Sequence, residues 1–287
     1  MNRILYAYLN IDHPMVAWEV AIGRIKSSCH DHNLGVSIWF YSQMQKYIAN
    51  PNSKLVIDEF KLELVRQASF PKKVSRLKGV YFFESFEMAN MALDRWNLTK
   101  HKKYITKVFF SADTYTNVDS EWITTFLGSD NDDEWMQQYW SGKTLGVKPL
   151  TEIIASGIGM IHDEKIKMQA YQKVIDRDPY TSIFLNMCIA GFREKRMLNI
   201  GQIFPSISHE SGVLKGGYFV HMEDMNKREQ EVGEAFQMAR AKGLNLPMFR
   251  HSDPDVFFTL PDLKILDFEF SQKEAMTLFD QIHTSIS

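Results

Sequence analysis

Apolar and polar positions along the first part of the chain follow the two periods that mark strands and helices. Aliphatic and aromatic residues alternate in Arg3–Asn10, which predicts a strand. A helix is predicted over Pro14–Lys26, because the missing N–H of Pro14 leaves no hydrogen bond unmade in a first helical turn. Apolar residues at helical spacing predict two more helices, at Ile38–Ala49 and Val56–Arg66.

Shorter elements follow in mixed order. Ser85 is a predicted N-cap for a helix over Phe86–Trp96. Apolar, β-branched and aromatic runs predict strands at Leu77–Glu84, Lys103–Ser111, Thr151–Ala155 and Gly157–Ile161. The last two form a pair of short strands with a break at Gly157. Glu121–Leu127 is predicted as a short strand or turn. This mixture of short strands and helices predicts an α+β fold.

The pattern changes from about Asp163 onward. Helical periodicity there predicts helices over Lys165–Asp176, Tyr180–Met197 and Asp224–Lys242. A stretch rich in glycine and serine, Ile207–Tyr218, separates them, and a strand over Lys264–Phe270 and a final helix capped by Ser271 complete the chain. We therefore expect two domains, residues 1–165 and a mostly helical region of unknown role over residues 166–287.

The composition is that of a globular protein, with 45% hydrophobic and 24% charged residues in 287. No apolar run is long enough to span a bilayer, and the N-terminus lacks the pattern of a signal peptide. The two cysteines, Cys29 and Cys188, lie far apart without metal-ligand neighbours. This favours a reducing compartment without disulfides, so we expect a cytoplasmic protein with no metal site and no membrane partner.

Charge is distributed unevenly although the net charge is only −2. Residues 61–107 are rich in lysine and arginine, whereas residues 111–140 contain acids and neither lysine nor arginine. A basic surface of this kind attracts the phosphates of a dinucleotide or a polynucleotide. It can equally be a solvated surface that the acidic segment balances, and the sequence leaves both interpretations open.

Glu152 is the most prominent candidate for chemistry. It is a single acid at the start of an otherwise apolar predicted strand, and the aromatic stretch Gln138–Gly142 precedes it. Some enzymes that cleave NAD keep the residue that holds the ribose at such a position. The alternative is a glutamate on an edge strand that faces water.

An ordered set of motifs gives a resemblance. The set begins with Phe-Pro at Phe70 and Ser-Arg-Leu at Ser75–Leu77, followed by an aromatic strand with Tyr81 and the capping Ser85. It continues with Asp-x-x-Trp at Asp119 and Trp122 and aromatic-Trp-x-Gly at Trp140 and Gly142. It ends with a glutamate at a strand start, Glu152. This order resembles bacterial ADP-ribosyltransferase-like domains and, more distantly, the DarT-type toxins that modify nucleic acid. The resemblance covers about residues 1–162.

The resemblance implies two small antiparallel sheets splayed around a cleft for NAD. It implies that Glu152 is the catalytic carboxylate and that Tyr81 packs on nicotinamide. Arg76, with Ser75 beside it, could hold the diphosphate through its planar guanidinium, and the alternative is a surface arginine that pairs with the acidic loop. The first strand normally supplies a histidine or arginine to the adenosine ribose, whereas this chain has Tyr6 and Tyr8 there.

The resemblance also bears on the acceptor. Members that modify arginine carry an acid or amide two positions before the glutamate, and this chain has Leu150 there. A nucleic-acid base is therefore the expected acceptor, RNA ahead of single-stranded DNA, with the basic stretch that holds Lys72, Lys73 and Lys78 as its binding surface. Enzymes of this class are commonly toxins of toxin–antitoxin or phage-defence systems, which implies an inhibitory antitoxin partner. A protein acceptor and an inactive, transferase-like binding module remain the alternatives.

Overall fold

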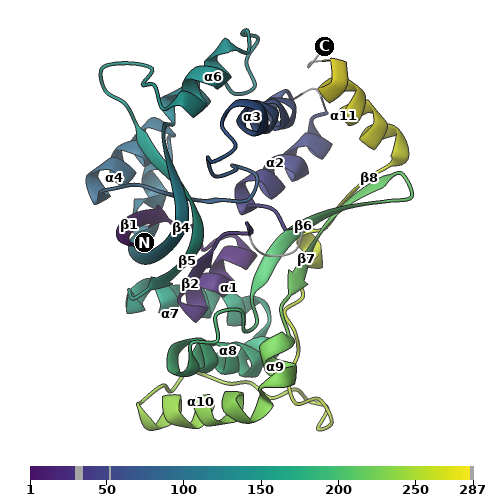
Figure 1. Ribbon diagram of the computed structural model, residues 1–287. Helices are drawn as coiled ribbons and strands as arrows, with labels where there is room; N and C mark the ends of the chain where they lie inside the picture. The colour runs from purple at the N-terminus through teal and green to yellow at the C-terminus, as the bar shows by residue number, and fades with distance from the viewer. Residues whose placement is uncertain (30–34, 52, 285–287) are drawn as a thin grey trace.

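The computed structural model describes residues 1–29, 35–51 and 53–284, and it contains two antiparallel sheets with helices packed around them (Figure 1). The predicted α+β class is confirmed. The first sheet consists of β1 (Asn2–Tyr8), β2 (Arg24–Lys26), β3 (Val80–Phe82), β4 (Ile105–Asp119) and β5 (Thr151–Ile161). The second consists of β6 (Ile203–Glu210), β7 (Val213–Val220) and β8 (Phe268–Phe270).

The helices correspond in large part to those predicted from the sequence. Their bounds are α1 (Pro14–Ile22), α2 (Ile38–Ala49), α3 (Leu55–Ser69), α4 (Phe86–Arg95), α5 (Glu121–Phe126), α6 (Glu134–Ser141), α7 (Glu164–Arg177), α8 (Ser182–Lys195), α9 (Glu223–Lys227), α10 (Glu229–Ala241) and α11 (Gln272–Thr284). Three short 3-10 helices are η1 (Thr99–Tyr104), η2 (Pro179–Thr181) and η3 (Lys264–Leu266). The predicted N-cap is confirmed, since the hydroxyl of Ser85 accepts a hydrogen bond from the N–H of Met88.

The first sheet curls back on itself. β4 lies between β1 and β5, and β5 pairs on its other edge with β3 and then with β2. Tyr6 of β1 also exchanges both backbone hydrogen bonds with Phe83, directly after β3, at 2.9 and 2.8 Å. The sheet therefore closes around a hydrophobic interior at the end where β5 begins.

Gly157 does not break β5, so the prediction of two short strands was wrong. The strand runs without interruption over Thr151–Ile161, and the register against β4 shifts between Ala112 and Thr114 instead. A Cβ on Gly157 would lie 2.2 Å from the carbonyl oxygen of Ser111, and its φ is +139°. Glycine is thus the residue that lets β5 pass this irregularity and change partners from β3 to β2.

Two N-terminal predictions are corrected by local hydrogen bonding. The helix expected over Pro14–Lys26 ends at Ile22, because Gly23 adopts φ 91° and closes the helix, after which the chain enters β2. The segment expected as a short strand or turn is the helix α5, and the carboxylate of Asp119 accepts the N–H of Glu121 in its first turn.

The C-terminal region contains more strand than predicted. The glycine- and serine-rich stretch Ile207–Tyr218 is part of a hairpin, since β6 and β7 pair over their full lengths and β8 adds to β7. The helix expected over Asp224–Lys242 is interrupted at Arg228. The strand expected over Lys264–Phe270 is shorter than predicted, because η3 occupies its first half.

The largest hydrophobic cluster joins both halves of the chain. It combines the inner face of the first sheet, including Leu5 and Phe110, with Phe184 of α8 and Leu263 near the C-terminus. Trp18 stacks on Phe184 with ring centroids 5.6 Å apart, and its indole N–H donates to the carbonyl of Gly201 at 2.7 Å. In Figure 1, α7, α8 and α10 accordingly lie in succession beneath the sheet. The division into two domains at residue 165 stays a prediction.

Candidate functional site

Glu152 is the second residue of β5, and its side chain is directed away from the hydrophobic interior of the sheet. Its neighbour Ile153 belongs to the main core, whereas Ile154, two residues on and therefore on the same face as Glu152, packs in the cluster under α3 and α6. Glu152 is only 6% exposed. The start of β5 thus carries a carboxyl group beneath two helices.

Arg76 lies at the centre of the polar groups around Glu152. Its Nε and Nη2 donate to the carboxylate of Glu59 at 3.0 and 2.8 Å, a two-pronged pairing. Its Nη1 donates to the hydroxyl of Tyr139 at 2.8 Å and lies 4.0 Å from Oε2 of Glu152. Glu59, Arg76 and Tyr139 are all buried. Arg76 therefore holds one glutamate tightly and the other loosely.

Two aromatic residues complete this arrangement, and one of them was a predicted site residue. The Arg76 guanidinium carbon lies 5.4 Å from the ring centre of Tyr81 and 5.6 Å from that of Tyr139. The Tyr81 hydroxyl donates to the Arg76 carbonyl at 2.7 Å. The structure thus brings together Glu152, Tyr81 and Arg76, three of the residues that the sequence singled out.

Trp39, in the first turn of α2, connects the group to the surface. Its indole N–H donates to Oε1 of Glu59 at 2.8 Å, and the residue is 38% exposed. We name the group the Arg76 cluster, and it consists of Trp39, Glu59, Arg76, Tyr81, Tyr139 and Glu152.

Burial controls the protonation of the cluster. Burial raises the pKa of Glu152 from 4.5 to about 7, the charge of Arg76 opposes this, and Glu59 adds to it. Burial alone disfavours the Arg76 cation, yet Glu59 holds the pKa of Arg76 well above its ordinary value. Burial likewise raises the pKa of Tyr81 well above 10.0. Glu152 can thus exchange a proton near neutral pH.

A carboxyl with a pKa near 7 has two chemical uses. It can transfer protons near neutral pH, and its ionised form can stabilise a positive charge that develops beside it. Burial strengthens the second effect, because the surroundings of Glu152 screen charges less than water does. The arrangement suits a reaction in which a cation forms next to the start of β5.

The other predicted cofactor-binding residues have partners outside the cluster. The Ser75 hydroxyl donates to Oε2 of Glu63 at 2.8 Å. The Tyr8 hydroxyl lies 3.0 Å from Nδ1 of His101, and burial raises the pKa of Tyr8 to about 12. Tyr6 meets Phe86 edge-on, at 6.2 Å between ring centroids. In the part of the chain that the structure describes, none of these three side chains bonds to Glu152.

Tyr6 and Tyr8 nevertheless lie close to the start of β5. Both pack in a hydrophobic cluster under α4 that includes Phe83 and Leu150. Leu150, the residue two before Glu152, is fully buried in this cluster. The two tyrosines therefore border the Arg76 cluster without joining it.

The basic stretch divides into paired and unpaired residues. Lys61 pairs with Asp133 at 2.8 Å, and Arg95 pairs with Glu121, so the acidic segment neutralises part of the stretch. The three predicted nucleic-acid-binding lysines are Lys72, which is exposed, and Lys73 and Lys78, which are half-buried. Within the described residues, their ammonium groups form no ion pair. This leaves a smaller basic surface than the sequence indicates.

Sequence reasoning assigned no role to three members of the cluster, Trp39, Glu59 and Tyr139, although Tyr139 is the aromatic residue of the aromatic-Trp-x-Gly motif. A signal for Glu59 exists: it lies three residues after Val56 and three before Leu62, on the face of α3 that is buried. A glutamate on a buried helical face requires a partner of opposite charge, and Arg76 is that partner.

Comparison with known proteins gives a family without an assigned activity. The model of a family described as "Protein of unknown function (DUF2441)" matches residues 12–167, more than half of the chain. No curated protein matches the sequence. Among the described residues, no helix is long and apolar enough to cross a membrane, and no group of three or more metal-ligating side chains comes together.

Proposed function

The chain belongs to this DUF2441 family, and we propose that it is an NAD-dependent mono-ADP-ribosyltransferase that modifies a nucleic-acid base. Glu152 is the catalytic carboxylate, and Tyr81 and Arg76 form its surroundings. The observation that carries the proposal is the Arg76 cluster, in which Glu152 has a pKa of about 7 beside two aromatic rings and a cation. The toxin role and the inhibitory antitoxin partner rest on the sequence resemblance alone.

The reaction needs a carboxylate where positive charge develops. As the bond between the ribose C1′ and the nicotinamide nitrogen breaks, its electron pair leaves with nicotinamide and the ribose becomes cationic. Ionised Glu152 accepts a hydrogen bond from a ribose hydroxyl and offsets this charge. A nucleophilic atom of the acceptor base then bonds to C1′ and loses its proton. With its pKa raised to about 7, Glu152 still has a substantial ionised fraction at neutral pH.

The present partners of Arg76 limit its role toward NAD. All three of its side-chain nitrogens face protein groups, with Nε and Nη2 on Glu59 and Nη1 on Tyr139. Binding a diphosphate would require Arg76 to leave Glu59. Arg76 is therefore better suited to position Glu152 and Tyr81, while Trp39 provides the exposed edge of the cluster.

The fold is compatible with this proposal in one respect. β5 has different partners along its two halves, β3 over residues 153–155 and β2 over residues 158–160. This splits one edge of the sheet near Gly157, and Glu152 lies on the β3 side. Two splayed sheets around an NAD cleft are the arrangement that the resemblance implies, and they remain part of the proposal.

A nucleic-acid acceptor is supported by two features. Leu150 is buried and apolar, so this position offers no polar group to orient an arginine side chain. The unpaired Lys72, Lys73 and Lys78 offer positive charge on the segment that also contains Arg76. A protein acceptor is the second possibility for the same chemistry.

One observation favours a different class of function, a binding module without catalysis. Glu152 is 6% exposed and Arg76 is saturated by protein partners, which is the state expected of a structural ion cluster. The two functions differ in what happens when Glu152 loses its charge.

An assay with labelled NAD distinguishes the transferase from the binding module. The full chain is incubated with labelled NAD and total RNA, denatured DNA or cell protein, beside Glu152→Gln and the matched control Glu210→Gln, whose glutamate is exposed on the hairpin of the second sheet. We expect label on RNA that survives in Glu210→Gln and disappears in Glu152→Gln. Label on protein alone would change the acceptor, and intact NAD with no label on any polymer would support the binding module.

A further inference from the structure

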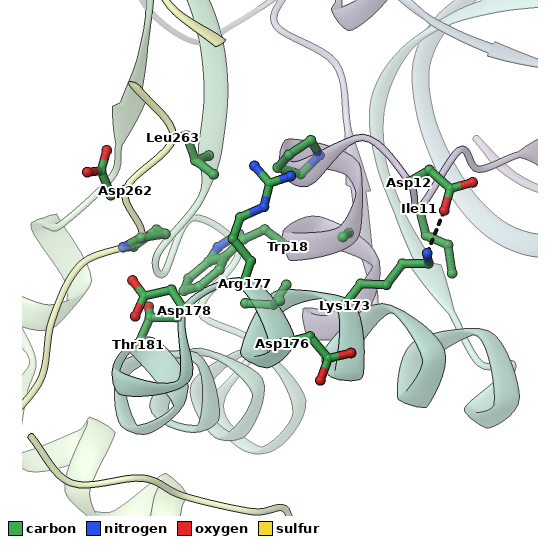
Figure 2. Close-up of a pocket in the computed structure, with 14 residues that line it drawn as sticks. Ile11, Asp12, Trp18, Lys173, Asp176, Arg177, Asp178, Thr181, Asp262 and Leu263 are labelled. Atoms are coloured by element: carbon green, nitrogen blue, oxygen red, sulfur yellow. Dashed lines mark hydrogen bonds and ion pairs between the residues drawn. The ribbon is translucent and has the colours of Figure 1, made fainter. Parts of the chain in front are cut away.

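A pocket of about 340 Å³ lies between α1, α7 and the C-terminal part of the chain (Figure 2), and none of its lining residues belongs to the Arg76 cluster. Its lining comes from three segments: the start of α1 with the residues before it, the C-terminal end of α7 with η2, and the segment after Pro261. These are Ile11, Asp12, Pro14, Ala17, Trp18, Lys173, Val174, Asp176, Arg177, Asp178, Thr181, Pro261, Asp262 and Leu263. The family match ends at residue 167, so the last two segments lie outside it.

Two of the charged side chains that line the pocket form an ion pair with each other, and in the described chain Arg177 lines it without one. Lys173 and Asp12 neutralise each other at 2.5 Å on one side, as the dashed line in Figure 2 shows. Arg177 extends between this pair and the opposite side, and within the described residues its guanidinium forms neither a hydrogen bond nor an ion pair. An unpaired cation thus borders the pocket.

Two carboxylates lie on the opposite side. Asp178 and Asp262 each use one oxygen on a backbone N–H, that of Tyr180 at 3.2 Å and that of Lys264 at 3.0 Å. In the described part of the chain neither forms an ion pair with a lysine or arginine, and Figure 2 shows them on the same side as Leu263. This side of the pocket therefore offers negative charge, while Arg177 offers positive charge.

Thr181 gives an independent indication of a ligand. The residue is fully buried, it lines the pocket, and its hydroxyl has no hydrogen-bond partner among the described residues. A buried hydroxyl without a partner is unfavourable, so a polar ligand group that reaches it from the pocket would be favoured. Figure 2 shows Thr181 beside Asp178.

We propose that this pocket binds a small zwitterion of the amino-acid type. Its carboxylate pairs with Arg177, its ammonium pairs with Asp178 and Asp262, and its apolar part lies against Trp18 and Leu263. A simple anion would be repelled by the carboxylates, and a simple cation would leave Arg177 without a partner of opposite charge. The volume lies in the range of sites for small molecules.

Titration calorimetry of the full chain with free L-amino acids tests this site, with L-leucine as the reference probe. Isocaproate and isoamylamine have nearly the same apolar part, but each lacks one of the two charges. We expect at least one free amino acid to bind and both singly charged analogues to bind about tenfold more weakly or not at all. The proposal is overturned if no amino acid binds, or if an analogue binds as tightly as the amino acid.

Variants connect the binding to these residues. Arg177→Gln removes the cation at the end of α7 and is expected to weaken binding about tenfold or more, and Thr181→Val to weaken it about fivefold. Arg250→Gln, at an exposed arginine outside the pocket, is the matched control and leaves the affinity unchanged. Unchanged affinity in Arg177→Gln would contradict the assignment. The pocket and the Arg76 cluster share no residue, so Glu152→Gln binds normally whatever its activity.

Discussion

The Arg76 cluster and the pocket lined by Arg177 each combine an arginine with two carboxylates, but they satisfy its charge differently. Arg76 is buried, and each of its side-chain nitrogens faces a protein partner, with two of them donating to Glu59. Arg177 is exposed and, in the described chain, has no protein partner, while Asp178 and Asp262 lie across a cavity. The first arrangement is complete without a ligand, and the second is not.

This difference shows that a group of charged residues is not by itself a binding site. Burial makes charges expensive, so a buried arginine is retained only with compensating partners, and those partners occupy the atoms that a ligand would use. Glu152 is the exception within the Arg76 cluster. Its 4.0 Å separation from Arg76 leaves it incompletely compensated, which its raised pKa reflects.

The largest expected effect comes from removing Arg76. Arg76→Ala leaves Glu59 buried without its cation, and we expect it to lower the free energy of unfolding by about 3–5 kcal/mol. Urea unfolding measures this loss, with Arg250→Ala as the exposed control. A loss near zero would mean that Glu59 and Arg76 are not the compensating pair that separates this cluster from the pocket.

The next effect depends on pH and concerns Glu152. Its pKa in the folded chain is raised from 4.5 to about 7, so the folded state holds the proton more tightly than the unfolded chain does. Stability from this group is present at low pH and is lost as the pH rises through about 7, by about 3 kcal/mol in total.

Glu152→Gln cannot ionise and therefore escapes this loss. Relative to the original chain, we expect its free energy of unfolding to gain about 3 kcal/mol between about pH 4.5 and pH 8. Unfolding of both proteins at the two pH values measures the difference. If the stabilities of both proteins change with pH in parallel, the pKa of Glu152 is not raised, and another group accounts for the pH dependence.

A smaller effect concerns the basic surface. Replacing Lys72, Lys73 and Lys78 by Gln is expected to weaken RNA binding and to reduce the slope of log affinity against log salt by about 2–3. The exposed Lys165 and Lys273, replaced together, serve as the control. An unchanged slope would show that these lysines contact no phosphate and would favour a protein acceptor.

The sequence predicted elements well where the determining signal is local. The helix Ile38–Ala49 and the cap at Ser85 depend on residues within one or two turns, and both are confirmed. Gly157 was misjudged because the reason for its presence, the close approach of Ser111, lies on another strand. Gly23 carries a local signal that could have ended the first helix correctly.

The candidate site was predicted only in part for the same reason. Glu152, Tyr81 and Arg76 form part of an ordered motif set, and so does Tyr139, to which the set assigned no role. Glu59 and Trp39 lie outside the set and join the cluster through the packing of α3 and α2. The pocket was not predicted, since Trp18, Arg177 and Asp262 come from segments far apart in the chain. Pairings of this kind depend on tertiary structure and leave no periodic pattern.

The most direct test of the account is the pH dependence of NAD cleavage in the presence of the acceptor, measured for the original chain, Glu152→Gln and Glu210→Gln. We expect the rate to rise with pH around a midpoint near 7 in the original chain and in Glu210→Gln, because ionised Glu152 is the active form. We expect Glu152→Gln to be slower by about a hundredfold to a thousandfold. Cleavage that persists in Glu152→Gln, or no cleavage by the original chain with any acceptor, would contradict the proposal that the Arg76 cluster is an active site.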